Sequence, residues 1–180
     1  MKRTPDPDNE RAADLRRAFD QAFCEAPAGP AQETESLLAL RVGGGAYAVR
    51  LDEIAGLFAD QAIVGLPSAV TEFLGVSGLR HDVVPVYDLR SLLGYTVGGD
   101  RPRWLVTARS PHPVAFAFEH FEGHLRVLRS ASLPSRDGAG SAHVRATLSL
   151  ADGPRGVVSI AALLETIEDR IRRLGKAKEH

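Results

Sequence analysis

The sequence has only one cysteine, Cys24, among its 180 residues. One thiol forms neither an intramolecular disulfide nor a thiolate metal cluster, so both are excluded and a reducing, cytoplasmic setting is expected. Long apolar runs are also missing. None approaches the ~20 residues that cross a bilayer, and residues 1–19 lack the apolar core of a signal peptide. We therefore expect a cytoplasmic protein with no direct membrane insertion.

Net positive charge is absent as well, since the formal net charge is −1 and lysine occurs only at positions 2, 176 and 178. Nucleic acids and anionic membranes are bound by clustered Lys and Arg, so the overall charge gives no reason to expect either partner. The composition, 44% hydrophobic and 25% charged, is that of an ordinary globular protein.

Sequence motifs of catalysis are also lacking. No serine lies in a GxSxG motif, and Cys24 falls in a helical pattern where a small packed residue is expected. The glycine-rich stretches at 43–45 and 97–100 lack the GxxxxGK spacing of a phosphate-binding loop. Asp82 and Asp88 are interpreted as a hairpin-turn residue and a helix cap. No cofactor is predicted, and a small hydrolase or metal-dependent enzyme is the least favoured function.

One histidine-rich stretch, HFEGH, is a candidate metal site. His120, Glu122 and His124 alternate, so they would share one face of a strand. Zinc sites need three or four ligands, and no second cluster of His or Cys lies nearby in the sequence. The stretch is therefore either a weak metal site or, as we favour, a solvated polar strip; no metal is predicted.

The N-terminal region predicts an amphipathic helix at residues 8–24. Its apolar face is formed by Leu15, Phe19 and Phe23, which must be buried either on the protein's own barrels or on another chain. A Pro- and Gly-containing linker follows. The domains expected are a helix and linker at 1–34, a main domain at 35–168, and a helix end and tail at 169–180.

The main domain is dominated by short apolar runs of strand type. The first set is expected at 36–42, 46–51, 62–67, 73–80 and 82–89, with a helical stretch at 52–58. The second set is expected at 103–109, 113–119, 124–133, 143–151 and 153–159. Two sets of five strands framed by two helices predict an all-β double barrel.

The last element is the clearest helix of the sequence. Ser159 is its expected N-cap and Gly175 its expected end. Its apolar face consists of Ile160, Leu163, Leu164, Ile167, Ile171 and Leu174.

Residues 73–94, FLGVSGLRHDVVPVYDLRSLLG, resemble the most characteristic stretch of CheW-type coupling proteins, whose pattern is roughly LGxxNLRGxxxPVxDLRxxLG. The residues that coincide include Leu74, Gly75, Leu79, Arg80, Pro85, Val86, Asp88 and Leu89. Further likeness in the first hairpin and in the strand pair that opens the second half extends the resemblance over residues 36–168.

The resemblance implies two intertwined, five-stranded, SH3-like barrels without enzymatic activity. It also implies an adaptor that joins the cytoplasmic helical tips of chemoreceptors to the regulatory domain of a chemotaxis histidine kinase, at membrane-bound receptor arrays. The alternative is a CheW-like scaffold recruited to a different motility or cell-organisation partner.

The same resemblance implies where partners bind. Arg80 matches the family's arginine at the junction of the barrels, either as a contact residue or as a structural clamp. The remaining partner-binding candidates, for most of which core packing is the alternative, are Gly75, Val76, Leu79, His81, Val49, Ile54 and Leu57. Three positions depart from the family pattern: Gly56 replaces a Glu that often pairs with the arginine, Gly78 replaces Asn, and His81 replaces a Gly that tolerates positive φ.

Overall fold

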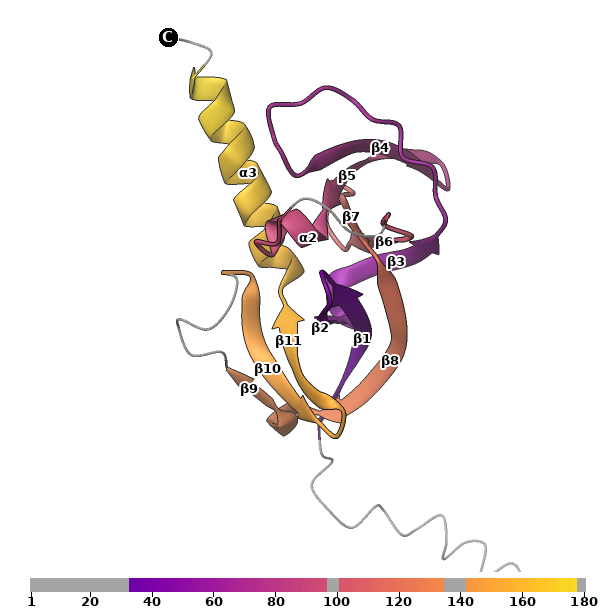
Figure 1. The fold of residues 1–180 in the computed structure, drawn as a ribbon, viewed down its shortest axis with the longest axis vertical. Helices are drawn as coiled ribbons and strands as arrows, with labels where there is room; N and C mark the ends of the chain where they lie inside the picture. The colour runs from indigo at the N-terminus through magenta and orange to yellow at the C-terminus, as the bar shows by residue number, and fades with distance from the viewer. Residues whose placement is uncertain (1–32, 97–100, 135–141, 178–180) are drawn as a thin grey trace, which may run out of the picture. The chain divides into compact units, whose positions relative to one another are not determined.

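The computed structural model, shown in Figure 1, describes residues 33–96, 101–134 and 142–177. The predicted helix at 8–24, with Leu15, Phe19 and Phe23, lies outside these residues. The elements of the first half are β1 (Thr34–Val42), β2 (Gly45–Arg50), the 3₁₀ turn η1 (Leu51–Glu53), β3 (Ile54–Ala59), β4 (Phe73–Leu79), β5 (Asp82–Asp88) and α2 (Leu89–Leu92). Those of the second half are β6 (Trp104–Ala108), β7 (Ala115–Phe118), β8 (His120–Leu128), η2 (Arg129–Ala131), β9 (Ser132–Pro134), β10 (Val144–Leu150), β11 (Gly153–Val158) and α3 (Ile160–Ala177).

Two sheets contain all of these strands, and each sheet takes strands from both halves of the sequence. Sheet A has the order β8-β1-β2-β11-β10-β9, and sheet B has the order β3-β6-β7-β5-β4. Parallel pairs, β2 with β11 and β5 with β7, join the two halves. The expected intertwined, strand-rich architecture is confirmed. Sheet A has six strands because the short β9 forms after η2.

Two predicted elements between β2 and β4 are wrong. The sequence predicts a helix at residues 52–58, but the chain forms η1 and then β3, which pairs with β6 through Ile54↔Ala108 and Leu57↔Val106. Pairing with a strand some fifty residues later overrides the local helical pattern. The sequence also predicts a strand at residues 62–67, but only Val64 pairs, in an isolated bridge to Val76.

Because proline lacks an amide donor, Pro85 is expected at a sheet edge or at a bulge. It lies at neither, since β5 lies between β4 and β7 and the irregularity of the β4–β5 pair falls between Phe73 and Gly75. It pairs with Val76, whose N–H and C=O both bond to Val64 and therefore point away from β5. Pro85 is thus in a position without hydrogen bonds to β4. The ladder to β7 begins only at Val86, so no ladder bond requires the missing N–H.

Both predicted helix caps are confirmed. Asp88 Oδ1 accepts the Arg90 N–H at 3.1 Å at the start of α2. Ser159 Oγ accepts the Ala162 N–H at 3.3 Å at the start of α3, and the Glu53 carboxylate accepts the Ile160 N–H at 2.6 Å. Glu53 follows β2 and leads into β3, so this last bond anchors α3 to the junction of the two sheets.

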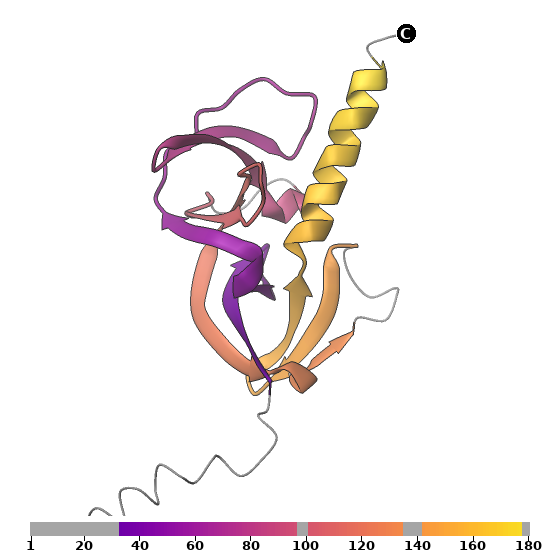
Figure 2. The ribbon, with the colours of Figure 1, turned by 180° about the vertical axis from the view of Figure 1, so that it is seen from behind.

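The largest core cluster fills the seam between the sheets. It combines Leu40 and Val49 of sheet A with Val106 and Phe116 of sheet B, together with Leu163 of α3. The two sheets are therefore held together by one continuous hydrophobic core. Figure 2 shows from behind how α3 leaves this seam and extends past the strands. The helix ends at Ala177 rather than at Gly175, since an exposed glycine within a helix costs only about 1 kcal/mol.

Candidate partner-binding surface

The β4–β5 hairpin carries the residues Gly75, Val76, Leu79, Arg80 and His81, all of which the sequence singles out. Leu79 pairs with Asp82, which leaves Arg80 and His81 as a two-residue turn. Arg80 has φ 56°, whereas His81 is not among the residues with positive φ. The expected restriction at His81 is therefore wrong, because the positive φ falls on Arg80, the first turn residue. Both turn side chains are exposed.

The Arg80 guanidinium lies over an aromatic ring. Its central carbon is 5.7 Å from the centroid of Phe58 in β3, a cation–π geometry. A Cβ on Gly56 would lie 2.9 Å from the same ring, so the glycine at this position leaves room for Phe58. Arg80 thus contacts an aromatic ring within sheet B rather than bridging the two sheets through a carboxylate. The sequence indicates the loss of the acid but not Phe58, which falls in the wrongly predicted helix.

Beneath this contact lies a depression of about 210 Å³. Phe58, Leu79 and Val84 belong to the second core cluster, that of sheet B, and also line the depression, so it opens onto the end of that core. Charged side chains stand around the apolar floor. The full lining consists of Ala55, Phe58, Leu79, Arg80, Asp82, Val84, Thr107, Ala108, Arg109, Ser110 and Pro113.

On the side of the hairpin opposite to Leu79 and Val84, the two strands expose an apolar surface, here called the hairpin face. Directly paired residues of an antiparallel sheet project to the same side. The register Val76↔Pro85 and Gly78↔Val83, extended by the bridge Val64↔Val76, therefore places all five on one side. Val83 is 72% exposed and Val64 is 61% exposed. Sequence alone does not reveal Val83, because it stands beside the buried Val84 in a run where both faces are apolar.

Gly75 is buried and serves the backbone rather than a partner. Its φ is 137°, and a Cβ there would lie 2.0 Å from the Val64 carbonyl oxygen. The missing side chain lets Val64 approach β4 closely enough to exchange two backbone hydrogen bonds with Val76, at 2.8 and 3.0 Å. Gly75 therefore allows Val64 to pair with β4 and to become part of the hairpin face.

The remaining predicted contact residues lie mainly in the core. Val49 and Ile54 are buried in the seam between the sheets, and Leu57 is half-buried against the same cluster. Leu79 is buried in the core of sheet B. For Val49, Ile54 and Leu79 the alternative of core packing therefore holds, and their side chains stabilise the fold. Arg80 and His81 are exposed, and Val76 and Leu57 retain part of their accessible surface.

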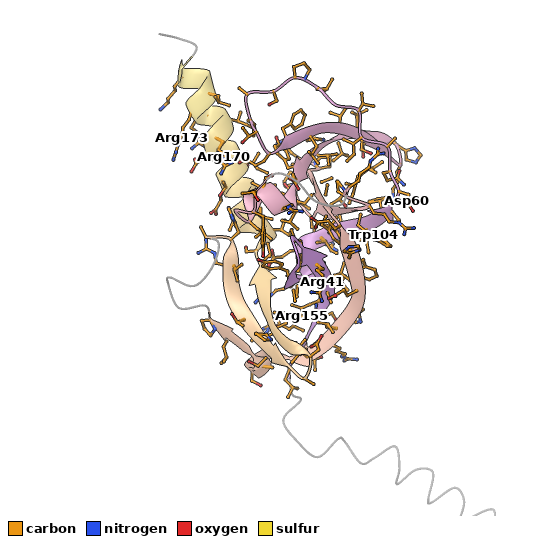
Figure 3. All side chains as sticks on the ribbon, in the orientation of Figure 1. Arg41, Asp60, Trp104, Arg155, Arg170 and Arg173 are labelled. Carbon is orange, nitrogen blue, oxygen red and sulfur yellow. The ribbon has the colours of Figure 1, made fainter. Side chains whose placement is uncertain are left out.

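The HFEGH stretch forms β8, where arginines bind Glu122. Arg155 Nη1 donates to Glu122 Oε2 at 2.5 Å, and Arg41 Nη2 donates to Glu122 Oε1 at 2.7 Å. Figure 3 shows Arg41 and Arg155 close together in sheet A. The hydrogen bond from Arg155, reinforced by Arg41, lowers the pKa of Glu122 below its ordinary value. No cluster of three candidate metal ligands occurs among the residues that the structure describes.

Comparison with known families completes this description. The family model of the CheW-like domain matches residues 36–168. The chain belongs to the CheW-like domain family. As a member of this family it is a non-catalytic, scaffold-type domain of chemotaxis signalling. No curated protein matches the sequence.

A solved structure agrees with this assignment. The CheW-like fold is similar to that of the scaffolding protein TtCheW from Thermoanaerobacter tengcongensis, with a TM-score of 0.65 and 12% sequence identity. The match covers 71% of this chain and 90% of that one. Within the described part of this CheW-like protein, no helix is long and apolar enough to span a membrane.

Proposed function

We propose that this CheW-like protein couples chemoreceptors to a chemotaxis histidine kinase, and that the hairpin face, together with Arg80 at the turn of the hairpin, binds one of these two partners. The exposure of Val83 carries the proposal. Its side chain is 72% exposed on a strand whose next residue, Val84, is buried, so its apolar surface gains nothing from the fold itself.

The surroundings of Val83 have the features of a protein–protein contact. An apolar centre on the hairpin face adjoins Arg80, whose guanidinium is already oriented by Phe58, and arginine is enriched at such interfaces. Asp82 and Arg109 add charges of both signs at the margin of the depression. A partner that covers this surface would desolvate Val83 and retain the charged groups at its rim.

Direct binding experiments with purified partners test this function. Wild-type protein is titrated, in separate experiments, with a chemoreceptor cytoplasmic fragment and with the kinase regulatory domain. Val83→Asp is expected to weaken binding of one of them by about tenfold or more, because a carboxylate would be buried at the centre of the contact. Leu133→Asp is the matched control, because Leu133 is also exposed but lies on β9 of sheet A.

Equal effects of the two substitutions would refute the hairpin face as the binding surface. Failure of the wild-type protein to bind either partner would refute the coupling function. If a motility or cell-organisation protein binds instead, and Val83→Asp weakens that binding as well, the recruited-scaffold function is indicated.

A further inference from the structure

The base of the β4–β5 hairpin, the end away from its Arg80 turn, contains a buried carboxylate. Glu72 stands directly before β4 and is only 7% exposed. Its backbone carbonyl accepts the Asp88 N–H at 2.7 Å, which continues the β4–β5 ladder beyond the pair Phe73↔Tyr87. A carboxylate that is buried in this way needs a counter-charge or several hydrogen-bond donors.

The counter-charge comes from α3. Arg170 Nη1 forms an ion pair with Glu72 Oε1, and no second ion pair of this carboxylate occurs within residues 33–96, 101–134 and 142–177. Arg170 is half-buried, and Figure 3 shows it on the part of α3 that extends past the strands. Beyond Ile167 no residue of α3 that the structure describes is fully buried. The ion pair therefore attaches the distal helix to the base of the hairpin.

The segment between β3 and β4, residues 60–72, depends on few contacts with the rest of the protein. Most of its side chains are exposed, although Ile63 packs on the core of sheet B. Figures 1 and 2 both show it lying along β4. Its middle is attached by the two hydrogen bonds between Val64 and Val76, and its end by the ion pair of Glu72. Because so little of the segment is packed in a core, loss of one attachment is expected to loosen the other.

We propose that Arg170 positions the hairpin face, and that its ion pair with Glu72 couples this face to the distal half of α3. Without Arg170, the Glu72 carboxylate would be buried with no counter-charge, which is unfavourable enough to force it into solvent. Its withdrawal would displace the 60–72 segment and remove Val64 from the hairpin face. Such coupling is reciprocal, so a partner that holds the hairpin face in place also holds Glu72 and, through it, the distal helix.

The inference deepens the proposed function and rests on it, because it concerns the regulation of the same binding surface. Binding at the hairpin face would reduce the motion of a helix that extends away from that surface. The protein would then transmit the presence of a partner by a change in local order, without any chemical step. The ion pair itself can be tested without a partner.

Hydrogen exchange of the free, full-length protein tests the ion pair. Arg170→Ala is expected to speed exchange of the Val64 and Val76 amides by about tenfold or more, because the segment opens more often. Arg172→Ala is the matched control, since Arg172 is also an arginine of α3 but pairs with Asp169 on the same helix. Circular dichroism checks that each variant is folded.

A double variant separates the effect of charge from that of lost packing. Glu72→Gln combined with Arg170→Ala leaves a neutral amide that needs no counter-charge, so slow exchange should return. The proposal is overturned if Arg170→Ala exchanges like Arg172→Ala, or if the double variant exchanges as fast as Arg170→Ala. If Arg170→Ala fails to fold, a folded double variant supports the proposal and an unfolded one overturns it.

Binding experiments test the coupling to a partner. The chemoreceptor fragment and the kinase regulatory domain are titrated as for Val83→Asp. Arg170→Ala is expected to weaken binding of the partner that is sensitive to Val83→Asp by about fivefold or more, whereas Arg172→Ala should leave it unchanged. The same partner should slow amide exchange of residues 171–176 in wild-type protein but not in the double variant.

The outcomes distinguish this inference from the proposed function. If wild-type protein binds neither partner, the proposed function fails, and exchange in the free protein still decides the role of Arg170. If a partner binds in a manner sensitive to Val83→Asp but exchange in α3 stays unchanged, the coupling is overturned and the proposed function stands.

Discussion

Replacing Gly75 with alanine is expected to release the segment around Val64 from β4. The new Cβ would lie 2.0 Å from the Val64 carbonyl oxygen, a distance that the backbone must relieve by moving. The movement would break the two hydrogen bonds between Val64 and Val76. Gly75 also has φ 137°, a conformation that residues with a side chain rarely adopt.

The magnitude follows from these two costs. Backbone strain of this kind costs about 1–3 kcal/mol. Each of the two lost hydrogen bonds contributes about 0.5–1.5 kcal/mol. Gly75→Ala should therefore reduce the free energy of unfolding by about 2–6 kcal/mol.

Gly78→Ala provides the matched comparison, because Gly78 lies in the same strand, has no positive φ, and would leave an added Cβ with no neighbouring atom within 4 Å. That substitution is expected to be neutral or to stabilise the protein by up to about 1 kcal/mol. Urea unfolding measures both free energies, and hydrogen exchange of the Val64 and Val76 amides reports the local contact. Equal stability of the two variants, or protected amides in Gly75→Ala, would refute the reasoning.

Two further predictions concern titratable groups. Glu122→Gln removes one of two carboxylates that bind the buried Arg155; because Asp152 still pairs with Arg155 at 2.7 Å, the loss should be about 1.5 kcal/mol in urea unfolding at neutral pH, and an unchanged midpoint would contradict this. Burial lowers the pKa of His143 below its ordinary 6.5. The unfolded chain then binds a proton at this histidine more readily than the folded chain does. The free energy of unfolding therefore has its full value above the pKa of the histidine in the unfolded chain, and declines as the pH falls below that pKa. The melting temperature should drop between about pH 7.5 and 5.5, and His143→Gln should reduce that drop; an identical pH profile would contradict the assignment.

Local patterns are sufficient for the elements whose residues specify their own limits. The caps at Asp88 and Ser159 and the apolar periodicity of α3 place two helices correctly, because hydrogen bonds within a few residues decide them. The glycines at 43–45 likewise predict the β1–β2 turn, in which Gly43 and Gly44 have positive φ.

Pairing between segments that are distant in the sequence decides the features that local patterns do not predict. β3 is a strand because β6 pairs with it, and the segment 62–67 is held by a single bridge because Gly75 admits Val64. Which of two neighbouring apolar residues faces solvent, as with Val83 and Val84, also depends on the strand partners. The Arg80–Phe58 contact joins the β4–β5 turn to β3, and no local pattern shows that these two segments lie close together.

The exchange of strands between the two sheets affects how the chain acquires its fold. Residues 33–96 supply only β1 and β2 to sheet A, and the residues from 101 onward supply only β6 and β7 to sheet B. Neither fragment contains a whole sheet, so each alone would leave strand edges unpaired and aggregation-prone. Folding must wait for contacts that are distant in sequence, which slows it. If the chain were cut between Thr96 and Arg101, neither fragment would thus fold alone, and the two would form the native sheets only when mixed.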